Sequence, residues 1–280
     1  MQATDWIVEV ENLRKSFGDS PALKGVSLRI RAGERVALLG ASGSGKSTLI
    51  RCLCGLETAE AGQVRVFGEP LQSEGKLSRE IRRLRRGIGV VFQQFNLVGR
   101  LPVMSNVLTG LAAEAPLWRA LSGRFTLLQR ARALEALEAI GLAPQAFQRA
   151  STLSGGQQQR AAIARVLVQG ARLLLADEPV ASLDPESTRR VMGLMAQLNR
   201  EAGMTLIVSL HHVALARRYC ERVIALRQGE LVYDGPSSAL TPEFLRELYG
   251  SAAEELESED EHIPVSIPIT QPAELAPLAA

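Results

Sequence analysis

The stretch GASGSGKST at residues 40–48 decides the fold class of this 280-residue chain. It fits the pattern GxxxxGK[ST], follows the apolar run RVALLG at residues 35–40 and opens a helix-like run at residues 48–53. This order predicts a loop that surrounds phosphate groups, because glycine lets backbone N–H groups approach where a Cβ would obstruct them. In such a loop Lys46 reaches the β- and γ-phosphates of a nucleotide, and the Ser47 hydroxyl ligates Mg²⁺. The predicted phosphate-binding residues are Gly40, Ala41, Ser42, Gly43, Ser44, Gly45, Lys46, Ser47 and Thr48.

Apolar runs that are typical of strands alternate with helix-like segments on both sides of this loop. The strand candidates are residues 6–13, 35–40, 64–67, 89–92, 173–176, 205–208 and 223–226, and the helix candidates include residues 125–140 and 185–200. Strands that alternate with helices predict an α/β fold with a mostly parallel sheet. Between about residues 104 and 170 the residue pattern changes and becomes mainly that of helices, so we expect a helical insertion in the α/β core.

The composition is that of an ordinary globular chain, with 46% hydrophobic and 22% charged residues. No run approaches the roughly 20 apolar residues that a membrane-spanning helix needs. The first residues lack the basic and apolar segments of a secretory signal. Three cysteines, an odd and small number, are typical of a reducing compartment, so we expect a cytosolic location.

The net charge of +2 is the sum of a basic body and an acidic C-terminal segment. Residues 251–280 carry seven acidic and no basic side chains, which leaves a net charge of +9 on residues 1–250. A basic body favours nucleotides, nucleic acid or an anionic membrane surface, but it is equally typical of solvated surface charge. Six acids at residues 254–262, followed by a Pro- and Ala-rich end, predict a disordered tail.

Two carboxylates end the apolar run LLLADE at residues 173–178. In open α/β sheets, nucleotides bind at the carboxyl ends of the strands. Asp177 is therefore expected to hold the water shell of Mg²⁺, and Glu178 to accept a proton from the attacking water.

A second anion-binding pattern, LSGGQ at residues 153–157, precedes the helix-like run at residues 158–168. One ATP needs only one phosphate loop, so a second such site calls for an explanation. LSGGQ resembles the signature motif of the ATP-binding cassette family. The resemblance implies a head-to-tail dimer in which each ATP lies between one phosphate loop and the signature of the other subunit. The residues that act across the dimer are then Ser154, Gly155, Gly156 and Gln157.

The same resemblance implies roles for two loops. Gln93 matches the family's glutamine loop, which touches Mg²⁺ and the attacking water and senses the membrane partner. Gln94 is less favoured because the family's glutamine directly follows the aromatic residue. Ser182 and Asp184, in the sequence Ser-Leu-Asp, match the loop that crosses the dimer interface.

His211 matches the switch histidine that contacts the γ-phosphate, and His212 is the competing candidate. Phe17 resembles the aromatic residue that stacks on adenine, with a role in the core or in a loop as the alternative.

Two further patterns suggest a binding site at first sight, but their details disfavour it. Cys52 and Cys54 are two positions apart on a predicted helix and therefore point in different directions, which disfavours a metal site. Residues 76–86 contain six basic side chains but no aromatic ones, so a solvated helical face is favoured over a nucleic-acid site.

The resemblance covers residues 6 to about 250 and implies a phosphate-loop NTPase of the cassette type. Its elements are a mostly parallel core sheet, an antiparallel β subdomain near the N-terminus and an α-helical subdomain inserted at about residues 95–170. We expect residues 1–250 to form this nucleotide-binding domain and residues 251–280 to form the tail. ATP and Mg²⁺ are the implied cofactors.

The chain carries one cassette and no membrane span, which is the usual arrangement of ATP-binding subunits of bacterial importers. The implied partners are a second copy of the chain, two transmembrane permease subunits and a periplasmic substrate-binding protein, with no nucleic acid. The implied location is peripheral, on the cytoplasmic face of the inner membrane.

Stretches outside the shared motifs resemble the ATP-binding subunits of bacterial phosphonate importers. They are residues 74–82, 92–98, 115–119, 210–211 and 218–229. His212 departs from this pattern, because the family more often has Gln there. A related substrate such as phosphite therefore remains an alternative. A soluble ATPase of a phosphonate-degrading complex and a nucleic-acid-binding ATPase remain as alternatives from other classes.

Overall fold

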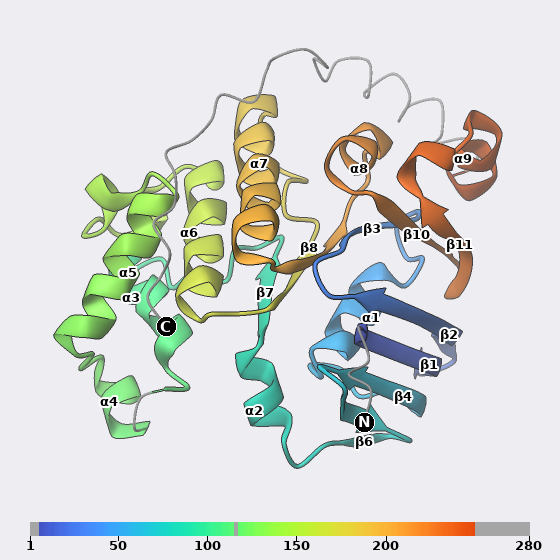
Figure 1. Ribbon diagram of the computed structural model, residues 1–280, viewed down its shortest axis with the longest axis horizontal. Coiled ribbons are helices and arrows are strands. Elements are labelled where there is room, and N and C mark those ends of the chain that lie inside the picture. The colour runs from blue at the N-terminus through green and yellow to red at the C-terminus, as the bar shows by residue number, and fades with distance from the viewer. Residues whose placement is uncertain (1–5, 115–116, 250–280) are drawn as a thin grey trace.

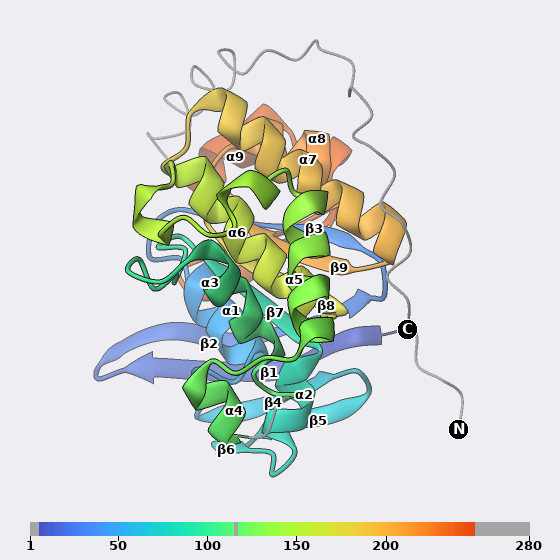
Figure 2. The ribbon, with the colours of Figure 1, turned by 90° about the vertical axis from the view of Figure 1, so that its left-hand side faces the viewer.

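The computed structural model describes residues 6–114 and 117–249, and the predicted tail at residues 251–280 lies outside them. Figure 1 shows three groups of elements: a helical group on one side, an antiparallel sheet on the other, and a core sheet between them. Figure 2 shows the layers from a second direction, with the antiparallel sheet below the core sheet and helices above it.

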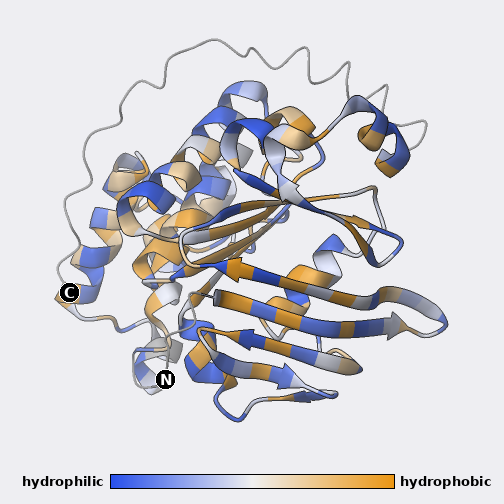
Figure 3. Cartoon of the chain, turned by 45° about the vertical axis from the view of Figure 1, so that its right-hand side comes forward, coloured by the Kyte–Doolittle hydropathy of each residue, from blue (hydrophilic) through white to orange (hydrophobic). Residues whose placement is uncertain are grey.

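The antiparallel sheet of the described residues has five strands in the order β2-β1-β4-β5-β6. Its strands are β1 (Trp6–Phe17), β2 (Ser20–Arg31), β4 (Ala61–Val66), β5 (Glu69–Ser73) and β6 (Lys76–Leu77). Alternating apolar and polar residues give these strands one buried face, and Figure 3 shows this alternation as colour bands.

The core sheet of the described residues has six strands in the order β11-β10-β3-β9-β8-β7. Its strands are β3 (Arg35–Leu39), β7 (Ile88–Phe92), β8 (Leu173–Asp177), β9 (Thr205–Ser209), β10 (Arg222–Arg227) and β11 (Glu230–Pro236). The first five run parallel to one another, and β11 pairs with β10 antiparallel. The carboxyl ends of β3, β7, β8 and β9 therefore meet at one edge, which is where the predicted site residues follow the strands.

The helices, apart from short 3₁₀ turns, are α1 (Lys46–Leu53), α2 (Ile81–Arg86), α3 (Val103–Leu108), α4 (Leu117–Ser122), α5 (Leu127–Ala139), α6 (Gly155–Val168), α7 (Pro185–Ala202), α8 (Val213–Tyr219) and α9 (Pro242–Tyr249). In Figure 1, α3 to α6 form the helical group, α7 lies beside it, and α8 lies farther along, between α7 and α9.

Two hydrophobic clusters cover the two faces of the core sheet. Along β3, Val36 and Leu38 join the cluster with α1 and the antiparallel sheet, whereas Ala37 and Leu39 join the cluster with α6, α7 and α8. Successive strand residues point to opposite faces, and β3, β8 and β9 in the middle of the sheet are accordingly buried along almost their whole length. The predicted α/β class with a mostly parallel sheet is confirmed.

The structure differs from two of the predicted elements. Helix α6 begins at Gly155, not at Gln158, because its first turn is capped by Ser154. The basic stretch is helical only from Ile81, and it is not simply a solvated face, since the Arg85 guanidinium donates to the carbonyl oxygens of Cys54 and Gly55 at 3.0 and 2.6 Å.

Gly89 fixes how closely α6 lies against β7. A Cβ at this position would lie 2.1 Å from Val166 Cγ1 and 3.0 Å from its Cβ, so the helix would have to shift. We expect Gly89→Ala to lower the free energy of unfolding by about 1–3 kcal/mol, as measured by urea denaturation. Gly193→Ala is the control, because that helical position is open and should gain about 0.5–1 kcal/mol. Equal stability of the two variants would contradict this explanation.

Candidate functional site

The phosphate loop joins β3 to α1, and its glycines are required by its conformation. Gly40, Gly43 and Gly45 all have positive φ, at 143°, 79° and 106°. A Cβ at Gly40 would lie 2.2 Å from the Leu226 carbonyl oxygen, and one at Gly45 would lie 2.6 Å from the Ala22 carbonyl oxygen. At Gly40 and Gly45 the backbone of the loop therefore packs directly against the backbone of neighbouring segments, whereas a Cβ at Gly43 would meet only open space.

Polar groups inside the loop fit a phosphate ligand. The Lys46 ammonium is buried and donates to the carbonyl oxygens of Gly40 and Ala41 at 2.6 and 3.1 Å. Burial lowers the pKa of Lys46, against the opposing effect of the carboxylates of Glu178 and Asp177. The Ser44 hydroxyl is buried and has no hydrogen-bond partner among the described residues, so a phosphate oxygen of a ligand could accept the hydrogen bond that this hydroxyl is able to donate.

Asp177 ends β8 beside this loop. Its Oδ1 accepts a hydrogen bond from the Ser47 hydroxyl at 3.0 Å, although the two residues are 130 positions apart in the chain. A carboxylate and a hydroxyl are hard oxygen donors, the kind that Mg²⁺ prefers, so this pair fits the predicted metal. Bound there with a nucleotide, Mg²⁺ would neutralise phosphate charge.

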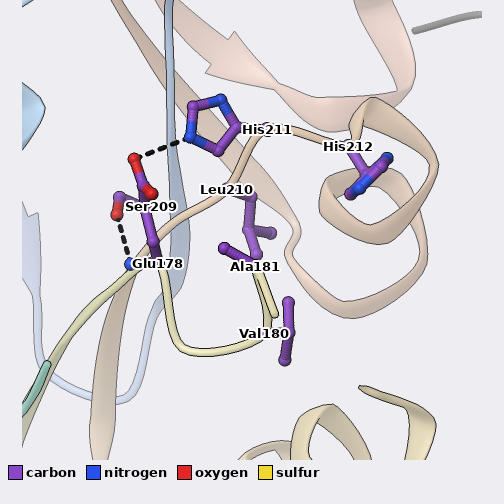
Figure 4. A pocket seen from close by; sticks show the side chains of 7 residues that line it. All are labelled: Glu178, Val180, Ala181, Ser209, Leu210, His211 and His212. Atoms are coloured by element: carbon purple, nitrogen blue, oxygen red, sulfur yellow. Dashed lines mark hydrogen bonds and ion pairs between the residues drawn. The ribbon is translucent and has the colours of Figure 1, made fainter. Parts of the chain in front are cut away.

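Glu178 follows in the left-handed region, with φ of 50°. Its Oε1 lies 2.6 Å from His211 Nε2, which comes from the loop after β9. Figure 4 shows the two side chains turned toward one another. Both of them line a pocket of about 290 Å³. A carboxylate and an imidazole in contact at the strand ends can hold a water molecule and move its proton.

The geometry distinguishes the two histidines. His212 is the N-cap residue of α8, and Figure 4 shows its ring directed away from Glu178. Only His211 is drawn in contact with the Glu178 carboxylate, so the geometry favours the predicted assignment over its alternative.

The signature residues lie at the capped start of α6. The Ser154 hydroxyl accepts from the Gln157 backbone N–H at 3.3 Å, and the Gln157 side chain accepts from the Ser154 N–H at 2.9 Å. This capping box leaves the other N–H groups of the first turn for an anion. A Cβ at Gly156 would lie 2.5 Å from Ser187 Oγ, which explains why α6 can approach α7 so closely here.

The predicted interface loop forms the start of α7. Ser182 and Asp184 are exposed, and Asp184 caps the helix by accepting from the backbone N–H groups of Glu186 and Ser187 at 3.0 and 2.9 Å. Hydrogen bonds from Ser187 lower the pKa of Asp184. Both short polar residues are thus presented at the surface next to the signature.

Gln93 and Phe17 have exposed side chains at the edge of the candidate site. Gln93 follows Phe92, whose Cα pairs with Asp177 in the neighbouring strand, and its side chain is exposed. The Phe17 ring is 48% exposed, with the Lys15 ammonium 5.0 Å from its centroid, so it is not a core residue.

Two residues near the site were not predicted. The Ser209 hydroxyl donates to Asp177 Oδ1, and the Tyr249 hydroxyl accepts from the Gly40 N–H at 3.2 Å. A hydroxyl at the end of a core strand was a usable signal for Ser209, but the predicted strand ended at Val208. Nothing in the sequence pattern points to Tyr249, which comes from α9 at the far end of the cassette.

Comparison with known proteins identifies the class. A family profile described as ABC transporter matches residues 23–181, more than half of the chain. The chain therefore belongs to the ABC transporter family as an ATP-binding cassette, and hydrolysis of ATP is the function of this family.

The relatives by sequence are more specific. A protein of Cupriavidus pinatubonensis named "Phosphonates import ATP-binding protein PhnC" is 58% identical over 266 residues, which cover 92% of this chain and 95% of the relative. A protein of Nostoc sp. named "Phosphonates import ATP-binding protein PhnC 1" is 54% identical over 254 residues, which cover 91% of this chain and 96% of the relative.

Solved structures agree with this fold. The cassette cbiO1 from Clostridium perfringens, part of the ABC transporter complex cbiONQ, matches with a TM-score of 0.73 and 29% identity, and the match covers 93% of this chain and 99% of that one. A bacterial ABC transporter cassette solved as a dimer matches with a TM-score of 0.73 and 35% identity. This match covers 83% of this chain and 100% of that one. Within the described part of the chain, no helix is both long and apolar enough to cross a membrane.

Proposed function

We propose that this chain is the ATP-hydrolysing subunit of a phosphonate importer. The observation that carries the hydrolytic part of the proposal is the contact of Glu178 with His211 beside Asp177 and the phosphate loop. In the proposed cycle two copies close around two ATP molecules, the closure moves a pair of permease subunits, and hydrolysis reopens the dimer. The subunit would then be peripheral to the cytoplasmic face of the inner membrane.

The proposed reaction uses the chain's own groups in order. Lys46 and the loop N–H groups would hold the phosphates, and Ser47 and Asp177 would hold the Mg²⁺ of the nucleotide. Water attacks the γ-phosphorus, its proton passes to Glu178, and the bond to the ADP oxygen breaks. His211 orients Glu178 and the γ-phosphate. Gln93 would contact the water from the adjacent strand end, and Phe17 would stack on the adenine.

A head-to-tail dimer would complete each site. Ser154, Gly155, Gly156 and Gln157 would face the γ-phosphate bound by the other copy, with Ser182 and Asp184 across the interface. The exposure of Ser154, Ser182 and Asp184 supports this arrangement, as does the helix N-terminus at Gly155, which favours negative charge.

Phosphonate as the transported substrate is supported by the names of the relatives, since the cassette itself does not touch the substrate. The test is transport in proteoliposomes that contain this chain, its permease subunits and the periplasmic binding protein. We expect ATP-dependent uptake of methylphosphonate. Uptake of phosphite alone would favour the related-oxyanion importer, and co-purification with lyase subunits without permeases would favour the soluble ATPase. Salt-dependent stimulation of the ATPase by DNA or RNA would support the nucleic-acid alternative.

We also propose that the cassette ends near residue 250 and that the acidic segment takes no part in catalysis. Removal of residues 254–280 should leave the ATPase rate of the purified protein within about twofold, because the sequence of that segment has no catalytic pattern. A collapse of activity in the truncated protein, with unchanged folding, would contradict this boundary.

A further inference from the structure

Ser209 links the carboxylate of Asp177 to the backbone of Glu178. It is the last residue of β9, is fully buried, and lies next to the end of β8 because the two strands are parallel neighbours. Its hydroxyl donates to Asp177 Oδ1 at 2.9 Å and accepts from the Glu178 backbone N–H at 2.8 Å. A serine hydroxyl can donate once and accept at the same time, so both bonds form together.

Both partners need such a restraint. Glu178 has a positive φ, which is disfavoured for a residue with a Cβ and persists only where the surroundings hold it. Asp177 Oδ1 is shared between the hydroxyls of Ser209 and Ser47, which approach it from two different elements. One buried hydroxyl therefore fixes both the carboxylate of Asp177 and the backbone from which the Glu178 side chain projects.

The same strand offers a comparison at its other end. Thr205, also fully buried, accepts a hydrogen bond from the Gly33 N–H at 2.9 Å, where it joins β9 to the turn before β3. Its bond resembles that of Ser209 in type and burial, but it lies at the amino end of the strand, away from the site. Thr205 is thus a purely structural counterpart.

We propose that Ser209 is a positioning residue for ATP hydrolysis, acting through Asp177 and Glu178. The inference rests on the roles proposed for those two residues. Loss of the hydroxyl leaves the Glu178 N–H without its acceptor and lets both carboxylates take orientations that are unproductive for the reaction. The phosphate loop keeps its own contacts, so the chemical step is affected more than ATP binding.

The experiment compares Ser209→Ala with Thr205→Val in the full-length protein. Alanine is smaller than serine and valine matches threonine in shape, so neither variant overfills the core. For Ser209→Ala we expect kcat to fall by about tenfold to hundredfold while KM for ATP changes by less than about threefold. Thr205→Val should keep kcat within about twofold.

Amide hydrogen exchange gives a second readout that does not depend on turnover. In nucleotide-free protein, the Glu178 amide should exchange at least about tenfold faster in Ser209→Ala than in the wild type, because its acceptor is gone. In Thr205→Val the Gly33 amide should accelerate instead, with Glu178 unchanged.

Two results would overturn the proposal: an unchanged kcat in Ser209→Ala, or an equal loss in Thr205→Val, which would indicate a general effect of core destabilisation. The underlying function is tested separately by Glu178→Gln. If that variant hydrolyses ATP normally, the proposed role of Glu178 fails. If it is inactive while Ser209→Ala is fully active, only the inference about Ser209 fails.

Discussion

Replacement of Glu178 by Gln should reduce ATP turnover by about 10²- to 10⁴-fold while ATP binding is retained. Gln has the shape of Glu but cannot take the proton from the attacking water. Since Lys46 and the phosphate loop are untouched, the variant should bind ATP and remain closed around it. Phosphate release measures the first effect, and size-exclusion chromatography with ATP measures the accumulated dimer.

The matched control is Glu230→Gln. This acid is exposed on β11, and its Oε1 lies 3.8 Å from the Lys24 ammonium, so its neutralisation should leave turnover unchanged. A Glu178→Gln protein that hydrolyses ATP at the normal rate would remove Glu178 as the base. Loss of ATP binding in the same variant would show instead that the carboxylate acts in binding.

The second large effect is expected for His211→Ala, with a loss of about 10²- to 10³-fold in kcat. The imidazole lies 2.6 Å from the Glu178 carboxylate, so its removal frees the base and removes a polar group from the position predicted for the γ-phosphate. ATP binding measured with a fluorescent analogue should change little, because the loop contacts remain.

His212→Ala serves as the control, since the two histidines are adjacent in the chain and differ in direction. We expect kcat within about threefold of the wild type, with some loss of stability at the start of α8. The opposite result, an inactive His212→Ala and an active His211→Ala, would move the switch histidine by one position.

The positions of the phosphate loop and of the two carboxylates in the fold could be predicted because the residue patterns that mark them are local. The glycines at residues 40, 43 and 45 lie with Lys46 in a stretch of seven residues, and Asp177 ends a short apolar run between helix-like segments, which favours a buried strand. Helix α6 begins three residues before the predicted helix-like run. Glycine disfavours a helix interior, but the capping box of Ser154 and Gln157 stabilises the first turn at Gly155 and Gly156.

The sequence by itself determined the α/β class, the phosphate loop and the strand that ends at Asp177, directly before Glu178, because the local residue pattern is sufficient for each. Tertiary structure decided which histidine meets Glu178, and it brought Ser209 and Tyr249 to the site. These contacts depend on the order of parallel strands and on the packing of the last helix. Spacing of residues along the chain does not encode how separate elements pair, so only the folded arrangement reveals them.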